Sequence, residues 1–181
     1  MSVLSHIDIA KRLSGQPGLG SPLVTTADQP NSVDLHLGER LLRLPYGMTI
    51  DPEADQSAQW QEVPLNSDGR WWVGQNALYL ATIAETINVP GDLVAFLHGL
   101  SSLGRLGLLV HVTAGLFDSG FVGRPTLELV SLGGSILLRP GMRIAQVTFH
   151  ALQTPVTVGY RGKYQNDTEP QPSRMFQEAR P

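Results

Sequence analysis

Val33-Asp34-Leu35-His36-Leu37 alternates apolar residues with polar or charged ones, which is typical of a strand that buries one face. Further strands are predicted for short runs that Gly, Pro, Asn and Asp separate from one another, at residues 40–44, 77–83, 93–97, 108–113, 125–130, 135–138 and 144–149. Many short strands at this spacing predict a mainly β fold, either a sandwich or a jelly roll.

Two short helices interrupt this pattern. The first is predicted at residues 1–14, where Ser5 and Asp8 have the spacing of a capping box. Its apolar face would come from Ile7, Ile9 and Leu13, and helix-breaking residues follow it: Gly15, Pro17, Gly18 and Gly20. The second helix, of one or two turns, is predicted at 101–107.

Length and composition favour a single domain, 1–181, with enough chain to bury a core. No apolar run reaches the roughly 18 residues that span a bilayer, so we expect no membrane partner. Residues 1–10 show no signal-peptide pattern, and we expect a cytoplasmic location. The formal net charge of −3 implies no general affinity for nucleic acid.

The chain contains no cysteine, which excludes disulfides and zinc sites built on thiolates, including those of zinc-dependent nucleobase deaminases. The histidines lack the spacing of a His-Glu-x-x-His site: His6, His36, His98, His111 and His150. We therefore expect no zinc and no metal ion held by protein side chains. A Mg²⁺ ion carried by the triphosphate of a nucleotide substrate is compatible with the sequence.

The segment from Ser101 to Arg105 opens the predicted internal helix. The first N–H groups of a helix, the hydroxyls of Ser101 and Ser102, and a nearby guanidinium would suit a phosphate group. The alternative, which the local sequence favours, is that Ser101 only caps a surface helix.

Two acidic residues are candidates for chemistry. Asp118 lies between glycine-containing turns, where it either shapes a turn or faces a sugar or a water in a cleft. On the following strand, Leu127 and Leu129 share one face, and Thr126 and Glu128 share the other. Glu128 is either solvated, as the local sequence favours, or desolvated in a cleft, where a raised pKa would make it a base.

The tail, 160–181, is polar and rich in Gln, Pro and Arg. It can bury little apolar area by itself, so we expect it to be mobile unless it docks. Aromatic and cationic residues mix at its start, in Tyr160, Arg161, Lys163 and Tyr164. Such a segment either closes over a nucleotide or is an ordinary flexible terminus.

Taken together and in this order, several segments resemble the dCTP deaminase family of the deaminase/dUTPase superfamily. They are QPNSVDLHLG (29–38), SSLGRLGLLVHVTA (101–114), FVGRPTLE (121–128), RPGMRIAQ (139–146), KYQ (163–165) and PSR (172–174). The resemblance is weakest between Arg40 and Val73. It implies a dUTPase-like β-barrel that assembles as a homotrimer, with active sites at subunit interfaces.

The resemblance also implies which residues act. Glu128 would be the base that activates water against C4 of cytosine, and Ser101 and Arg105 would be donors around the intermediate. The other implied residues contact dCTP or dUTP: Ser102, Thr113, Ala114, Gly115, Asp118, Phe121, Thr126, Leu127, Gln146, Tyr160 and Lys163. A feedback inhibitor, dTTP, is a further implied partner.

Two residues depart from the usual family pattern at positions where phosphate binding is expected. Leu100 replaces an Arg that commonly precedes the two serines, so one phosphate contact would be missing. Asp167 replaces a Gln, and its charge would repel phosphates unless it points away or meets magnesium.

A further departure concerns the reaction itself. Gly115 and Leu116 replace a common His-Arg pair. The resulting pattern is similar to that of bifunctional enzymes, which convert dCTP to dUMP and pyrophosphate, and to the Ala-Gly-x-x-Asp motif of dUTPases. We expect a dCTP deaminase that continues to dUMP and pyrophosphate. The alternatives are an enzyme that acts only on dUTP and a non-catalytic nucleotide-binding β-sandwich.

Overall fold

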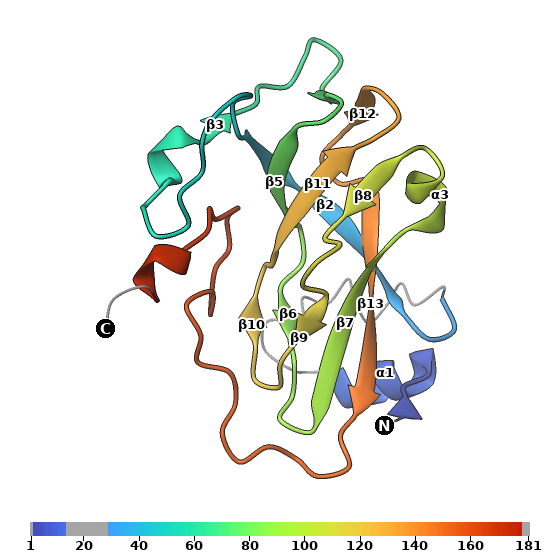
Figure 1. The fold of residues 1–181 in the computed structure, drawn as a ribbon. Helices are drawn as coiled ribbons and strands as arrows, with labels where there is room; N and C mark the ends of the chain where they lie inside the picture. Colours follow the sequence, from blue (N-terminus) through green and yellow to red (C-terminus); the bar gives the residue numbers. More distant parts are fainter. Residues whose placement is uncertain (1, 14–28, 179–181) are drawn as a thin grey trace.

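A computed structural model describes residues 2–13 and 29–178, and one antiparallel sheet of nine strands forms most of the fold (Figure 1). Seven strands follow in the order β8 (Leu108–Val110), β11 (Thr126–Ser131), β5 (Leu78–Ile83), β2 (Val33–Arg43), β13 (Arg143–Ala151), β7 (Leu93–Gly99) and β9 (Leu116–Phe117). The other two are β1 (Ser2–Val3), which pairs with β13, and β3 (Gln61–Glu62), which pairs with β2. Two small sheets pair β10 (Val122–Gly123) with β6 (Ile87–Asn88), and β12 (Ile136–Leu138) with β4 (Trp71–Val73).

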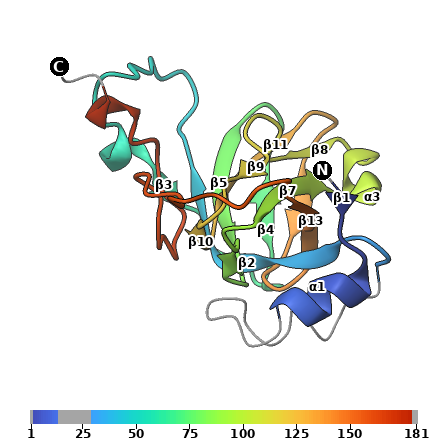
Figure 2. The ribbon, with the colours of Figure 1, turned by 90° about the horizontal axis from the view of Figure 1, so that it is seen from below.

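The sheet curls around an apolar core (Figures 1 and 2). β8 and β7 are far apart in the strand order, yet they approach each other, because a Cβ on Gly99 would lie 3.5 Å from Cβ of Val110. The core contains the side chains that the alternation places inward, among them Leu35, Leu127 and Leu129. The mainly β, jelly-roll fold predicted from the sequence is confirmed.

The central strand β2 joins two segments that the sequence analysis predicts as separate strands. Its pairing with β5 shifts register between Leu37 and Leu41. Gly38 lies at this irregularity, where a Cβ would come within 2.7 Å of Oγ1 of Thr82. The strand thus continues past the glycine because Gly38 allows β5 to approach closely.

The N-terminal helix, α1 (His6–Leu13), lies on the outside of the sheet near β2 (Figure 2). The first half of the predicted capping box is present, since the N–H of Asp8 donates to Oγ of Ser5 at 3.2 Å, and the Ser5 hydroxyl in turn donates to the Asp8 carboxylate at 2.8 Å. Ile9 and Leu13 are buried as predicted, but Ile7 is 65% exposed, so its assignment to the apolar face is wrong. The residues predicted to end the helix lie outside the described part of the chain.

The remaining described helices are short: α3 (Ser101–Gly104), η1 (Ser57–Gln59) and η2 (Met175–Gln177). Both η1 and η2 are 3-10 helices, and the segments that carry them lie side by side in both views (Figures 1 and 2). None of the helices in residues 2–13 and 29–178 has the length and apolarity needed to cross a membrane.

Candidate active site

A cavity of about 450 Å³ opens between the curled sheet and the C-terminal tail. Its wall includes Glu128 of β11, Asp118 after β9, and Tyr160 of the tail. We call it the Glu128 cavity. Strand alternation explains the orientation of Glu128, because Leu127 and Leu129 on either side are fully buried in the core.

Glu128 is only partly exposed to solvent. Its side chain retains 39% exposure, and its Oε2 lies 2.8 Å from Nδ1 of His111. This environment is intermediate between the solvated and the desolvated alternatives that the sequence leaves open. A half-buried carboxylate in a cavity wall, with one oxygen next to an imidazole, has the geometry required of a base acting on a bound water.

His111 is a functional candidate that the sequence analysis missed. It is 8% exposed, and its Nε2 lies 2.9 Å from the carbonyl oxygen of Ala114. Burial lowers its pKa, but the close contact and charge of the Glu128 carboxylate, and then the Ala114 carbonyl, outweigh burial, so the pKa of His111 is raised. The sequence signal was the His two positions before Thr113 in the 101–114 segment.

Aromatic rings connect His111 with the tail. The ring of His111 stacks on Phe117 with centroids 6.0 Å apart, and Phe117 stacks on Phe121 at 5.3 Å. Phe121 meets Tyr160 edge-on at 5.7 Å. Except for Tyr160, these rings are buried, so they form one apolar wall of the Glu128 cavity.

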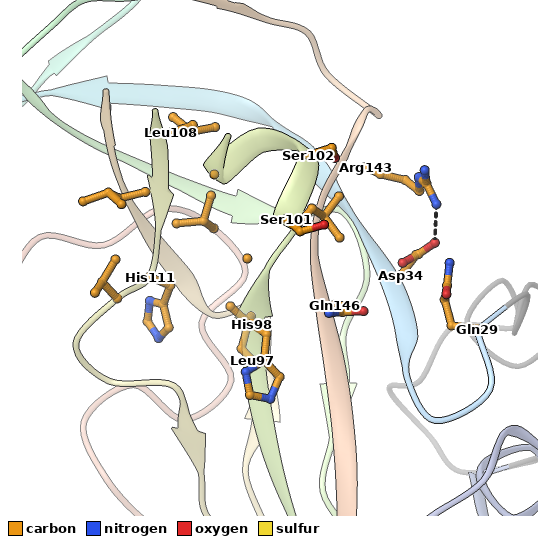
Figure 3. Close-up of a pocket in the computed structure, with 16 residues that line it drawn as sticks. Gln29, Asp34, Leu97, His98, Ser101, Ser102, Leu108, His111, Arg143 and Gln146 are labelled. Atoms are coloured by element: carbon orange, nitrogen blue, oxygen red, sulfur yellow. Dashed lines mark hydrogen bonds and ion pairs between the residues drawn. The ribbon is translucent and has the colours of Figure 1, made fainter. Parts of the chain in front are cut away.

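A second cavity, of about 690 Å³, lies on the other side of His111 (Figure 3). Ser101 and Ser102 of α3 line it together with Gln146 of β13, and we call it the serine cavity. Leu100, rather than Ser101, is the N-cap residue of α3, and no side chain caps this helix. The alternative in which Ser101 merely caps the helix is therefore wrong, and both serine side chains are exposed at the cavity.

Polar contacts organise the far side of the serine cavity. Oγ of Ser32 donates to Oε1 of Gln146 at 2.9 Å. Nη1 of Arg143 lies 2.7 Å from Oδ2 of the buried Asp34, as Figure 3 shows. The cation of Arg143 is thus already paired, and Gln146 keeps its amide nitrogen for another acceptor.

The predicted site residues therefore divide between two cavities. Ser101, Ser102 and Gln146 line the serine cavity, and the Glu128 cavity collects the following: Ala114, Asp118, Phe121, Thr126, Glu128 and Tyr160. The rest line neither cavity: Arg105, Thr113, Gly115, Leu127 and Lys163. His111 borders both cavities.

Three of the residues outside the cavities have evident structural contacts. A Cβ on Gly115 would come within 2.9 Å of the Leu97 carbonyl oxygen, so this position requires glycine for the approach of β7. The side chain of Leu127 is fully buried, which leaves only its backbone for contact with a ligand. Lys163 forms an ion pair with Glu178.

The tail docks on its own chain. The side-chain amide of Gln165 attaches the tail to the start of β10 and to the turn before it. Its Oε1 accepts from the N–H of Val122 at 3.1 Å, and its Nε2 donates to the Gly120 carbonyl at 2.9 Å. Farther along, the N–H of Gln171 donates to Oγ1 of Thr126 at 2.9 Å. Of the two states expected for this segment, the described part of the tail adopts the docked one.

Asp167 does not present a free charge to the Glu128 cavity. Its Oδ1 pairs with Nη2 of Arg174 at 3.1 Å, although its Oδ2 is buried without a partner. Arg124, which also lines this cavity, has a buried and unpartnered Nε. Among the described residues, no group of three or more His, Cys, Asp or Glu has the arrangement of a metal site.

Known proteins resemble this chain over nearly its whole length. A dCTP deaminase, dUMP-forming, of Methanopyrus kandleri is 38% identical over 187 residues, which cover 97% of this chain and 96% of that protein. A dCTP deaminase of Haloarcula marismortui is 39% identical over 184 residues, which cover 96% of this chain and 94% of that protein.

A solved structure shares the fold. The 2'-deoxycytidine 5'-triphosphate deaminase of Agrobacterium tumefaciens superposes with a TM-score of 0.66 at 23% identity, over 82% of this chain and 47% of that chain. Residues 3–152 match the family model described as dCTP deaminase-like. The resemblance inferred from the sequence is thereby confirmed, and the chain belongs to the dCTP deaminase-like family.

Proposed function

We propose that this protein converts dCTP to dUMP in two hydrolytic steps at one site. Glu128 and Asp118 share one cavity, and this is the observation that carries the proposal. The Methanopyrus relative is named as a dUMP-forming dCTP deaminase, which supports both steps. The Haloarcula relative is named only as a dCTP deaminase, so the second step needs its own test.

In the first step, the oxygen of a water bonds to C4 of cytosine. Glu128 takes a proton from that water and passes it to the amino nitrogen, which leaves as ammonia. The products are dUTP and ammonia. Donors fixed around the developing charge stabilise the intermediate, and Ser101 and Arg105 are the candidates for this role.

In the second step, a water attacks the α-phosphorus of dUTP and the bond to the pyrophosphate oxygen breaks. Asp118 orients this water, in keeping with the Ala-Gly-x-x-Asp spacing from Ala114. The substrate carries its own Mg²⁺, bound by phosphate oxygens and water, which neutralises part of the triphosphate charge.

The two cavities suggest how the site is completed. The serines that suit phosphate and the carboxylates that suit chemistry line different cavities of one chain. In the proposed homotrimer, the serine cavity of one subunit completes the Glu128 cavity of the next. Val112 in the wall of the serine cavity and Leu116 in the wall of the Glu128 cavity have exposed apolar side chains, which are suited to such a contact.

The remaining contacts follow from this assembly. Ser102, Gln146, Tyr160 and Lys163 bind the nucleotide, and Phe121 packs where a 2'-hydroxyl would otherwise fit. The same contacts would admit dTTP, which shares the sugar and the triphosphate, as a competitive feedback inhibitor.

The test is incubation of the purified protein with dCTP and, separately, with dUTP, each with Mg²⁺, followed by anion-exchange separation of the products. We expect dUMP, pyrophosphate and ammonia from dCTP. Accumulation of dUTP would remove the second step from the proposal. Consumption of dUTP alone would identify a dUTP diphosphatase, and unchanged nucleotides despite measurable binding would identify a non-catalytic binding protein.

A further inference from the structure

His111 has an unusual backbone conformation for a residue with a side chain. Its φ is +49°, in the left-handed region, directly after β8. Its N–H donates to the backbone carbonyl of Glu128 at 2.8 Å, so the turn brings the two residues side by side. Left-handed conformations cost free energy, and they persist where the surrounding structure fixes them.

The imidazole ring of His111 is held on three sides. Phe117 stacks on its face, the Ala114 carbonyl lies 2.9 Å from Nε2, and Glu128 Oε2 lies 2.8 Å from Nδ1. Neither Nδ1 nor Oε2 is in hydrogen-bond geometry with any group in the described part of the chain, so we treat their contact as an ion pair.

The carbonyl of Ala114 determines which nitrogen of the His111 ring carries a proton. A carbonyl only accepts, so Nε2 of His111 carries a hydrogen. Nδ1 then faces a carboxylate oxygen, and this contact is attractive only when one proton lies between the two groups. The pair therefore contains either an imidazolium next to a carboxylate or a neutral imidazole next to a carboxylic acid.

We propose that His111 is the positioning residue of Glu128. Its imidazole holds Oε2 of Glu128 in place through the ion pair, which leaves Oε1 to accept the proton of the attacking water. This inference rests on the proposed role of Glu128 as the base. The proton of His111 is not transferred in the cycle, because it serves only to hold the carboxylate in place.

The pH dependence of this arrangement has a definite sign. The pKa of His111 is raised above its ordinary value of 6.5, since Glu128 and Ala114 together outweigh burial. The imidazolium is present below that raised pKa and is lost as the pH rises through it, so kcat/KM should fall on the alkaline side. The other ionisable side chains on the two cavities that His111 borders are Asp118, Arg124, Tyr160, Tyr164 and Asp167 on one side, and Asp34, His98 and Arg143 on the other.

Two substitutions of His111 test the role of its imidazole ring without changing the backbone conformation. Glycine and asparagine both tolerate a left-handed φ, so neither substitution adds backbone strain. His111→Gly removes the donor to Glu128, whereas His111→Asn keeps a donor near the Nδ1 position but does not titrate. The matched control is His36→Asn, because Nδ1 of His36 lies 2.7 Å from Glu85 and His36 lines neither cavity.

The experiment has one measurement that does not depend on activity. The titration of the histidine Cε1–H groups is followed by NMR in the wild type and in Glu128→Gln. We expect the pKa of His111 to fall in this variant. An unchanged His111 pKa would overturn the proposed pairing even if the protein had no activity toward dCTP.

The second measurement is ammonia release from dCTP as a function of pH. We expect His111→Gly to lower kcat roughly 10- to 100-fold with little change in the Kd of dCTP. His111→Asn should recover most of the rate and lose the alkaline fall, and His36→Asn should match the wild type. Wild-type kcat and pH profile in His111→Gly would overturn the role. A wild type without deaminase activity would instead remove the proposed function, while the NMR titration would still test the pair.

Discussion

Arg174 and Asp167 form an ion pair, with 3.1 Å between Nη2 and Oδ1, that closes the tail into a loop. The guanidinium of Arg174 also donates to Oε1 of Gln171 at 3.0 Å and to the carbonyl of Lys163, and it packs over the ring of Tyr164. The charge of Asp167 is thus balanced within the tail, which removes much of the repulsion that it would exert on a triphosphate.

We expect Arg174→Gln to loosen the tail and to raise KM for dCTP about tenfold or more, because several charge-assisted hydrogen bonds are lost, each worth roughly 1.5–3 kcal/mol. Hydrogen exchange of the backbone amides of residues 163–171 should accelerate in the same variant. The control is Arg43→Gln, which removes an exposed cation from β2. Unchanged exchange in the tail would show that Arg174 does not hold it.

Much of the sheet is predictable because its strands are long enough to show alternation. Val33, Leu35 and Leu37 are fully or nearly fully buried, as their period of two indicates. Strands of two residues, such as β6, β9 and β10, are too short to carry such a pattern, and only the tertiary structure reveals them.

The candidate site is less predictable, because its residues meet only after folding. Glu128 is found through the family resemblance, but its neighbour His111 comes from the turn after β8, and no local sequence pattern places the two side chains next to each other. The docking of the tail also uses backbone hydrogen bonds, such as those from the N–H of Asn166 to the Val122 carbonyl and from the N–H of Arg124 to the Asp167 carbonyl, and every sequence can offer such bonds. Trp60 lines the Glu128 cavity from the region where the resemblance is weakest, so no motif indicated it.

Glu128→Gln should abolish deamination while leaving the nucleotide bound. Removing the base is expected to slow ammonia release by roughly 10²–10⁴-fold, since an amide cannot accept the proton of the water. Calorimetric titration should give a dCTP Kd close to that of the wild type, and dUTP cleavage should persist. A variant with wild-type ammonia release would exclude Glu128 as the base.

Asp118→Asn separates the second step from the first. We expect dUTP cleavage to fall by about 10²-fold, because an amide orients the attacking water less well than a carboxylate. Deamination should continue, so dUTP should accumulate from dCTP in a time course separated by anion exchange. Equal loss of both steps would mean that Asp118 binds the nucleotide rather than orienting one water.

Leu100→Arg restores the cation that the family commonly has before the two serines. Leu100 lines the serine cavity next to Ser101, so a guanidinium there can reach a phosphate bound at α3. We expect KM for dCTP to fall about two- to fivefold at low salt, as is typical of a solvent-exposed ion pair, and the gain to shrink as salt is added. Leu100 also packs against the core, so thermal unfolding should show a loss of roughly 1 kcal/mol in stability. An unchanged KM at every salt concentration would place the phosphates elsewhere.

Gly120→Ala should displace the tail, because the added methyl group would collide with the backbone of the segment that leads into it. Gly120 has a φ of +87°, and a Cβ there would lie 2.8 Å from Cα of Gly159 and 2.9 Å from the backbone nitrogen of Tyr160. Overpacking of this kind costs about 1–3 kcal/mol, so the free energy of unfolding should fall by that amount, and KM for dCTP should rise as Tyr160 leaves the cavity.

The control for this variant is Gly104→Ala, at a helical position of α3 where a Cβ meets no atom within 4 Å. Alanine in a helix is favoured over glycine by roughly 0.5–1 kcal/mol, so this substitution should stabilise the protein. The two glycine-to-alanine changes are therefore expected to shift the melting temperature in opposite directions. A melting temperature of Gly120→Ala equal to that of the wild type would mean that the tail does not pack against Gly120 in solution.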